Sequence, residues 1–218
     1  MAIALWYCPP QGSAVHESLQ LLITSLQSLF PNSPVFEPHI TITSDLNCKS
    51  ADDVNRILTS CVAAIRSIPP SQPLINFQNC TIGKSYFRKV VLECEPNRYL
   101  YSIAQIMREV YVEVDDASRT QRAATWARDE FKPHLSLLYS EVYPISQAFA
   151  RVIQQRIEDA LNVQMVKEPQ ENTSNAHQLQ WSFTNEPDSV QWSRPSTFKV
   201  VRCEGPASYW RVLGGTSI

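Results

Sequence analysis

The sequence predicts an α+β protein with two similar lobes around a central cleft. Segments with apolar residues at three- and four-residue spacing alternate with short segments in which every second residue is apolar. These two periods indicate helices and strands respectively. In addition, one nine-residue pattern occurs twice, at 36–44 and at 131–139. An internal duplication would set the two copies opposite each other and give the lobes an approximate two-fold symmetry.

Strands and helices are expected in turn along the first part of the chain. Residues 3–8 form an apolar strand that a Pro-Pro pair stops. Ser13 then caps a helix with a regular apolar face. The first copy of the repeated pattern follows as a strand, and Ser50 begins a second helix with a capping box in which aspartate replaces glutamate. Two more strands are expected at 74–80 and 86–94.

The rest of the chain continues this mixture. Asn97 caps a third amphipathic helix, and the polar residues 115–130 form a loop or a short exposed helix before the second copy. Another amphipathic helix spans 146–161. The polar stretch 164–178 has few apolar residues, which predicts a solvated insertion. Three strands close the chain, at 179–183, 198–204 and 208–213.

Each copy of the repeated pattern places a histidine and a hydroxyl on one face of a strand. Both copies run aromatic, charged, proline, histidine, and then apolar–hydroxyl–apolar. Because residues i and i+2 share a face of a strand, His39 points the same way as Thr41, and His134 the same way as Ser136. The apolar residues of the opposite face should be buried; they are Ile40, Ile42, Leu135 and Leu137.

Two imidazoles and two hydroxyls that face one cleft can perform acid–base chemistry on a phosphate without a metal. The pKa of histidine lies close to neutral pH, so one neutral imidazole can accept a proton from water while one imidazolium protonates a leaving oxygen. The hydroxyls can donate to the phosphate oxygens. No cluster of His, Cys, Asp or Glu has metal-ligand spacing in the sequence, and we expect neither a metal nor another cofactor.

Four aromatic residues are candidates to contact a nucleobase, since any aromatic face can stack on a base. They are Trp6 on the opening strand, Tyr86 and Phe87 at the start of the segment 86–94, and Tyr139 at the end of the second copy. For each of them the alternative is a place in the hydrophobic core, which is the commoner role of an aromatic side chain.

The composition narrows the classes of protein. The chain has 218 residues, 44% of them hydrophobic, and a formal net charge of −2. These values suit one large domain or two small lobes with a hydrophobic core, and they predict no broad surface for long nucleic acid. The sequence shows neither a basic signal segment nor an apolar run of about 20 residues that could form a transmembrane segment. Its six cysteines form no C-x-x-C pair, so reduced thiols are expected. We therefore expect a soluble intracellular monomer that binds a small anionic molecule.

The two motifs resemble those of a known group of enzymes. The residues HITIT at 39–43 and HLSLL at 134–138 each fit the pattern H-x-[ST]-x-apolar, and the opening strand IALWYC at 3–8 precedes them. In these features, and in element order over most of its length, the chain resembles the two-histidine phosphoesterases, in particular the fungal 2′,3′-cyclic-nucleotide 3′-phosphodiesterases. The resemblance implies one two-lobed domain over 1–218, with an antiparallel sheet in each lobe and a polar insertion at 164–178.

The resemblance further implies the reaction and its small substrates. Enzymes of this kind hydrolyse 2′,3′-cyclic nucleotides to nucleoside 2′-phosphates without a metal, and they also convert ADP-ribose 1″,2″-cyclic phosphate, a by-product of tRNA splicing, to ADP-ribose 1″-phosphate. By the same resemblance, His134 is the general base for water and His39 the general acid for the leaving O3′. A cytoplasmic protein is expected, with peripheral Golgi association as the alternative that fungal members suggest.

Other functions stay open from the residues alone. An RNA-end-processing phosphoesterase would open a terminal cyclic phosphate, and its binding would depend strongly on salt. A non-catalytic nucleotide-binding module would be expected to have lost a histidine or a hydroxyl, and all four residues are present. A purely structural α+β domain would leave the duplication without a reason.

Overall fold

A computed structural model describes residues 2–69, 73–113, 117–169 and 179–218 of the chain. Within these ranges the protein has five α-helices and one nine-stranded antiparallel sheet, so the predicted α+β class is confirmed. The strands lie in the spatial order β6-β7-β3-β4-β5-β2-β1-β8-β9. Their bounds are Ala2–Cys8 for β1, Ile40–Thr43 for β2, Phe77–Ile82 for β3, Val90–Cys94 for β4, His134–Leu138 for β5, Met165–Lys167 for β6, Leu179–Phe183 for β7, Thr197–Cys203 for β8 and Arg211–Ser217 for β9.

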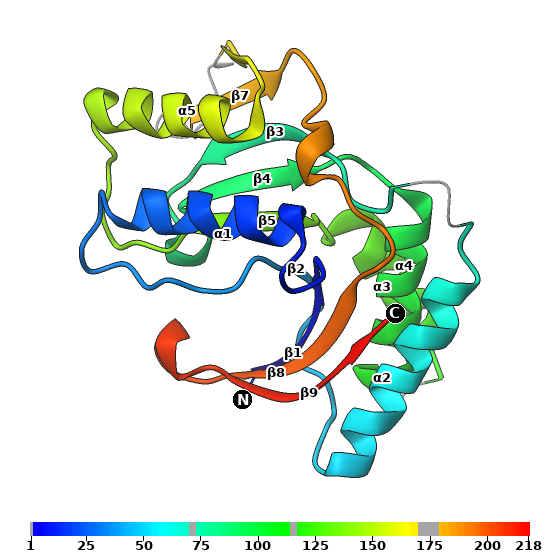
Figure 1. The fold of residues 1–218 in the computed structure, drawn as a ribbon. Helices are drawn as coiled ribbons and strands as arrows, with labels where there is room; N and C mark the ends of the chain where they lie inside the picture. The colour runs from blue at the N-terminus through cyan, green and yellow to red at the C-terminus, as the bar shows by residue number, and fades with distance from the viewer. Residues whose placement is uncertain (1, 70–72, 114–116, 170–178) are drawn as a thin grey trace.

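The helices form two groups over different halves of the sheet (Figure 1). In one group, α1 (Ala14–Gln27) packs against α5 (Gln147–Leu161) and β5. In the other group, α2 (Ala51–Arg66) packs against β8 and β9, α3 (Arg98–Tyr111) packs against β2, and α4 (Arg119–Asp129) lies on α3. Among the described residues, no helix combines the length and the hydropathy that a membrane crossing requires.

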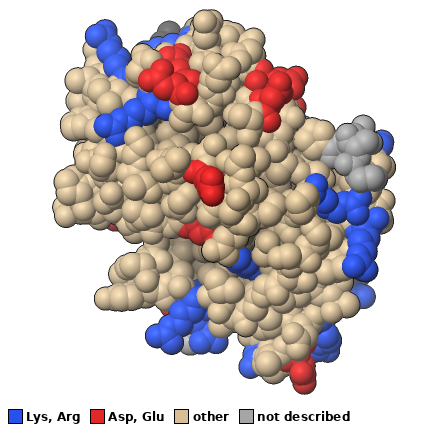
Figure 2. Space-filling view, viewed as in Figure 1, with Lys and Arg blue, Asp and Glu red and all other residues tan. Residues whose placement is uncertain are grey.

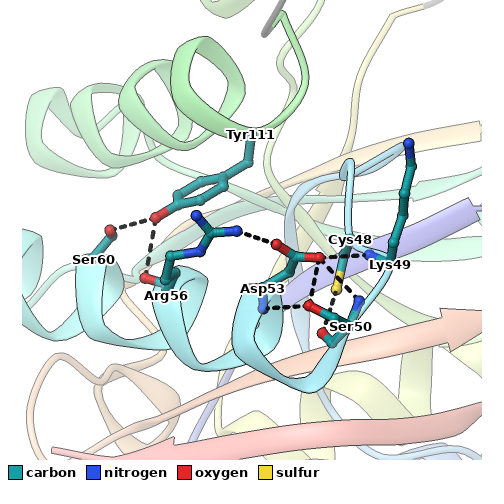
Figure 3. A network of polar contacts seen from close by, with 7 residues as sticks. All are labelled: Cys48, Lys49, Ser50, Asp53, Arg56, Ser60 and Tyr111. Atoms are coloured by element: carbon teal, nitrogen blue, oxygen red, sulfur yellow. Dashed lines mark hydrogen bonds and ion pairs between the residues drawn. The ribbon is translucent and has the colours of Figure 1, made fainter.

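Side chains cap the helices where the sequence predicts them. The Ser13 hydroxyl and the Asn97 amide oxygen each accept backbone N–H groups of the first turn that follows, which satisfies donors that a helix start leaves unpaired. Ser50 and Asp53 form the expected capping box at the start of α2 (Figure 3). The Asp53 carboxylate accepts the backbone N–H groups of Ser50 and Lys49, both at 2.9 Å.

A polar network next to this cap joins α2 to α3 (Figure 3). The Tyr111 hydroxyl at the end of α3 donates to the Arg56 carbonyl oxygen at 3.0 Å, and it lies 2.6 Å from the Ser60 hydroxyl. Arg56 in turn pairs with Asp53 of the capping box. The network fixes two helices of the same group against each other, and α3 supports the central strand β2.

The two copies of the repeated pattern form β2 and β5, which are neighbours at the centre of the sheet. They pair antiparallel at Ile40 and Leu135, and both side chains are fully buried. Ile42 and Leu137 are buried as well, so the predicted apolar face is confirmed. Because the two central strands pair, the strands of both halves belong to one continuous sheet rather than to one sheet per lobe; the two-fold symmetry of the lobes stays a prediction.

Two strands begin later than the sequence predicts, because short 3₁₀ turns precede them. Tyr86–Arg88 forms such a turn, so only the later part of the segment expected at 86–94 is strand β4. Likewise, Ala207–Tyr209 is a turn, and the strand expected at 208–213 is β9, which starts after it. Local backbone hydrogen bonds within each turn replace the ladder bonds that the alternating pattern suggested.

Two segments predicted to be polar and exposed contain regular structure. The stretch 115–130 includes α4, the short helix that was one of two alternatives. The predicted insertion at 164–178 begins with β6, which pairs with β7 and buries Met165. The burial of one methionine and the ladder with β7 explain why this polar segment forms a strand. The remainder of the predicted insertion, 170–178, lies outside the described residues.

We expect Leu135→Ala to lower the free energy of unfolding by about 2–5 kcal/mol, because it removes a fully buried side chain from the residue pair that joins the central strands. Leu21→Ala is a matched control: Leu21 lies on α1 with 71% of its surface exposed, so its loss should change stability by less than about 0.5 kcal/mol. Urea unfolding of both variants measures the difference. Equal stability of the two variants would contradict a core role for the central pair.

Candidate active site

The polar side chains of both repeated patterns line one cavity of about 260 Å³ beside the central strands. His39 and Thr41 reach it from the first copy, and His134 and Ser136 from the second. Aromatic side chains form much of the remaining wall; they are Trp6, Phe87, Tyr139 and Trp210. The structure therefore brings together all four residues that the two motifs single out.

The register of the central strands explains how the four residues meet. Ile40 and Leu135 are paired. Extending this antiparallel register by one residue in each direction sets His39 opposite Ser136, and Thr41 opposite His134. Cross-strand neighbours share a face of the sheet, so each imidazole stands beside the hydroxyl of the other motif. The apolar faces of the same strands enter the core, which leaves the polar face to line the cavity.

Each histidine ring is held by a backbone carbonyl of its own motif. Nδ1 of His39 lies 2.6 Å from the carbonyl oxygen of Glu37, and Nδ1 of His134 lies 2.8 Å from that of Lys132. A carbonyl oxygen can only accept a hydrogen bond, so the neutral rings carry their proton on Nδ1. Nε2 of each ring therefore keeps its lone pair for a ligand. A proline separates each carbonyl from its histidine and restricts the backbone of both partners.

Burial keeps both imidazoles neutral in the free protein. The pKa of His39 is lowered to about 4, chiefly by the loss of solvation; the bond to the Glu37 carbonyl opposes this shift, and the nearby charges of His134 and Lys199 add to it. Burial likewise lowers the pKa of His134 to about 4, helped by Arg88 and opposed by the bond to Lys132 and by the Glu93 carboxylate. An anion in the cavity would favour the imidazolium and raise these values.

The two hydroxyls are not equivalent in this structure. The Ser136 hydroxyl donates to the carbonyl oxygen of Phe87 at 2.9 Å, so its proton is engaged by the turn Tyr86–Arg88. To donate to a bound phosphate it must rotate away from that carbonyl. Thr41 is half-buried at the cavity wall. This difference could not be predicted from the two motifs, because the position of Phe87 depends on a turn that is distant in the chain.

The structure separates the four aromatic candidates. Trp6 stacks on the ring of His39, with centroids 3.7 Å apart and an interplanar angle of 11°. Tyr139 is buried and stacks on Phe36, while Phe87 is about half exposed. These three line the cavity with the histidines. Tyr86 does not; it lines a separate hollow on the protein surface.

Sequence reasoning missed two features of the site. Trp210, on the turn between β8 and β9, completes the aromatic wall. Lys199 of β8 forms an ion pair with Glu37, the residue whose carbonyl holds His39. Neither residue lies in a motif, and only the pairing of β8 with β1 brings them to the site. No sequence signal marked Trp210, because the segment 208–213 was predicted to be a strand, in which a tryptophan is an ordinary residue.

The described residues hold no group of three or more His, Cys, Asp or Glu side chains that could bind a metal ion. The cavity instead offers two nitrogen lone pairs and two hydroxyls. Such a set can accept a proton, return a proton and donate hydrogen bonds to an oxyanion.

Comparison with known proteins adds a family relationship. The chain matches the family described as cyclic phosphodiesterase-like protein over residues 1–218. It is 54% identical to the 2′,3′-cyclic-nucleotide 3′-phosphodiesterase of Saccharomyces cerevisiae, over 100% of both chains. Proteins of the same name from Eremothecium gossypii and Kluyveromyces lactis are 44% and 42% identical, over 100% of this chain and 100% and 99% of theirs. These matches extend over both copies of the repeated pattern.

We expect both imidazoles of the free protein to stay neutral until the pH falls to about 4. Inorganic phosphate should raise at least one of the two pKa values, because an anion in the cavity favours the imidazolium. NMR titration of the ring Hε1 signals, assigned with His39→Asn and His134→Asn, measures both effects. Midpoints near the ordinary histidine value of about 6.5 in the free protein would show that the rings are not desolvated.

Proposed function

The chain belongs to the cyclic phosphodiesterase-like protein family, and from this premise we propose that it hydrolyses 2′,3′-cyclic nucleotides to nucleoside 2′-phosphates without a metal ion. Its activity as a 2′,3′-cyclic-nucleotide 3′-phosphodiesterase rests on the close homology to relatives of that name. The mechanism rests on one observation: the imidazoles of buried His39 and half-buried His134 line one cavity, and each is held through Nδ1 by a backbone carbonyl.

In the proposed mechanism, the cyclic phosphate binds between the two histidines and its negative charge allows one ring to take up a proton. Nε2 of neutral His134 removes a proton from water as the water oxygen attacks phosphorus. The bond between phosphorus and O3′ breaks, and the His39 imidazolium protonates O3′. The product is the 2′-phosphate. His134 then loses its new proton to solvent and His39 takes one up, which returns both rings to their starting states.

The hydroxyls and a nearby cation stabilise the phosphate in this proposal. Thr41 and Ser136 donate to its non-bridging oxygens, and a donor that is already oriented is worth roughly 3 kcal/mol in the transition state. Ser136 must first release the Phe87 carbonyl, so its contribution includes the loss of that bond. Arg88, whose charge acts on His134, adds positive potential on the side of the attacking water.

The surroundings of the two rings support different roles for them. His39 stacks on the face of Trp6, and an aromatic face favours a cation above it. The charge of Lys199 disfavours protonation of His39, but the ion pair of Lys199 with Glu37 balances that charge. These contacts favour His39 as the ring that carries the proton, and therefore as the general acid, in agreement with the family resemblance.

We further propose that the substrates are small. The volume of the cavity suits a mononucleotide. On the face of the molecule that Figure 2 shows, Lys and Arg side chains lie in separate groups rather than in one continuous tract. That distribution favours a cyclic mononucleotide over a long RNA end. ADP-ribose 1″,2″-cyclic phosphate, the by-product of tRNA splicing, is proposed as a second substrate. The active unit would be a monomer with one two-lobed domain over 1–218.

Incubation with 2′,3′-cyclic AMP tests the reaction. We expect adenosine 2′-phosphate, identified by chromatography against both phosphate isomers, at the same rate with and without EDTA. The His39→Ala/His134→Ala double variant, purified in the same way, controls for contaminating enzymes. Loss of activity after chelation that a divalent ion restores would refute metal independence. Adenosine 3′-phosphate as the product would refute the proposed direction of cleavage.

Each single alanine variant, His39→Ala and His134→Ala, should lower kcat for 2′,3′-cyclic AMP by roughly 10²- to 10⁴-fold. A cyclic phosphate with a phenolate leaving group, such as 1,2-phenylene phosphate, needs less help from an acid. With 1,2-phenylene phosphate as the substrate, His39→Ala should therefore lower kcat much less than His134→Ala does. Rescue of the His134 variant alone would reverse the assignment and leave the two-histidine mechanism intact.

A further inference from the structure

Trp210 lines the cavity together with the histidines and three other aromatic side chains. It follows the turn Ala207–Tyr209, between β8 and β9. Its ring lies 5.7 Å from that of Phe87, 5.8 Å from Trp6 and 5.9 Å from Tyr139, measured between centroids. Trp210 thus contacts all three of the other aromatic rings that line the cavity, and it is the one that comes from a turn at the edge of the sheet.

The cavity offers two kinds of surface with different chemistry. The imidazoles and hydroxyls gather at the central strands, where they suit a phosphate. Phe87, Tyr139 and Trp210 present aromatic surface, which suits a flat apolar group such as a nucleobase. A cyclic nucleotide has the same polarity along its length, with the phosphate on one side of the ribose and the base on the other. The base of a bound substrate would therefore lie between Phe87 and Trp210.

The space between these two rings is too small for a base in the free protein. Atoms of stacked rings approach to about 3.5 Å, so a base between two rings needs their planes about 7 Å apart. The centroids of Phe87 and Trp210 are 5.7 Å apart, with an interplanar angle of 32°. One of the two rings must move by about 1–2 Å to admit a base.

Trp210 is the better placed of the two to move. Its indole N–H donates to the carbonyl oxygen of Gly205 at 3.2 Å, and its backbone N–H donates to that of Ala207. Both bonds are internal to the turn, so the turn can shift without breaking them. Phe87, in contrast, offers its carbonyl to Ser136 of the central strand β5.

We propose that Trp210 is a specificity-determining residue that closes on the nucleobase from the β8–β9 turn and holds it against Phe87. The proposal rests on the proposed function and names the part of the substrate that this wall recognises. Trp210 acts on the base alone, so it sets the KM for nucleotides and leaves the chemistry at phosphorus unchanged.

The test compares a nucleotide with a substrate that has no base. Trp210→Ala should raise the KM for 2′,3′-cyclic AMP by roughly 5- to 150-fold, the range expected for the loss of one base–aromatic stack, with little change in kcat. For methyl ribofuranoside 2,3-cyclic phosphate, neither KM nor kcat should change. Trp210→Phe should keep most of the affinity for the nucleotide. Tyr209→Ala is the matched control, because Tyr209 is its neighbour on the same turn, is 70% exposed and does not line the cavity.

Binding of the product separates this proposal from the proposed reaction. Calorimetry with adenosine 2′-phosphate needs no turnover, and Trp210→Ala should weaken this binding while Tyr209→Ala should not. NOEs between the rings of Trp210 and Phe87 should also weaken when the nucleotide binds. If Trp210→Ala raised the KM equally for the nucleotide and for the base-free substrate, or changed neither KM, the role of Trp210 would be overturned. Failure of the wild-type protein to hydrolyse 2′,3′-cyclic AMP, with base-dependent binding intact, would refute the reaction instead.

Discussion

The site depends on one backbone pairing, that of β2 with β5 at Ile40 and Leu135. The two strands are distant in sequence, yet their contact brings both histidines and both hydroxyls to one cavity. The same contact buries the alternate apolar residues in the core. A shift of the register by one residue would exchange the two faces, placing the imidazoles in the core and the apolar side chains in the cavity. The stability of the core therefore selects the register that builds the site.

The backbone, rather than a second set of side chains, orients the imidazoles. Glu37 and Lys132 differ in charge, but each offers its carbonyl oxygen to the histidine two positions later. Duplication of the short pattern thus carries the ring orientation with it. The wider surroundings are not duplicated, since Trp6 stacks on His39 whereas Arg88 and Glu93 act on His134. Two identical groups can in this way take opposite roles in one reaction.

The sequence was sufficient for the features that local chemistry determines. The caps at Ser13, Ser50 and Asn97, the apolar face of the central strands and the α+β class all follow from residue types at fixed spacing. It was not sufficient for features that tertiary contacts create. The turn at Tyr86–Arg88 interrupts an apolar alternation, and Trp210 reaches the cavity only because β8 pairs with β1. No periodicity within those segments records either fact.

Burial of the histidines couples their protonation to the presence of substrate. A shift of the pKa from 6.5 to about 4 means that protonating either ring in the empty cavity is disfavoured by roughly 3 kcal/mol more than in water. A phosphate anion about 4 Å away, at the effective dielectric constant of a partly buried site, would stabilise an imidazolium by roughly 4 kcal/mol. The two values are of similar size, so a bound anion would favour the uptake of one proton. A second proton is opposed by the first imidazolium, whose repulsion already acts between His39 and His134. In the proposed mechanism, the cavity would therefore acquire its one-acid, one-base state only when the anion is in place.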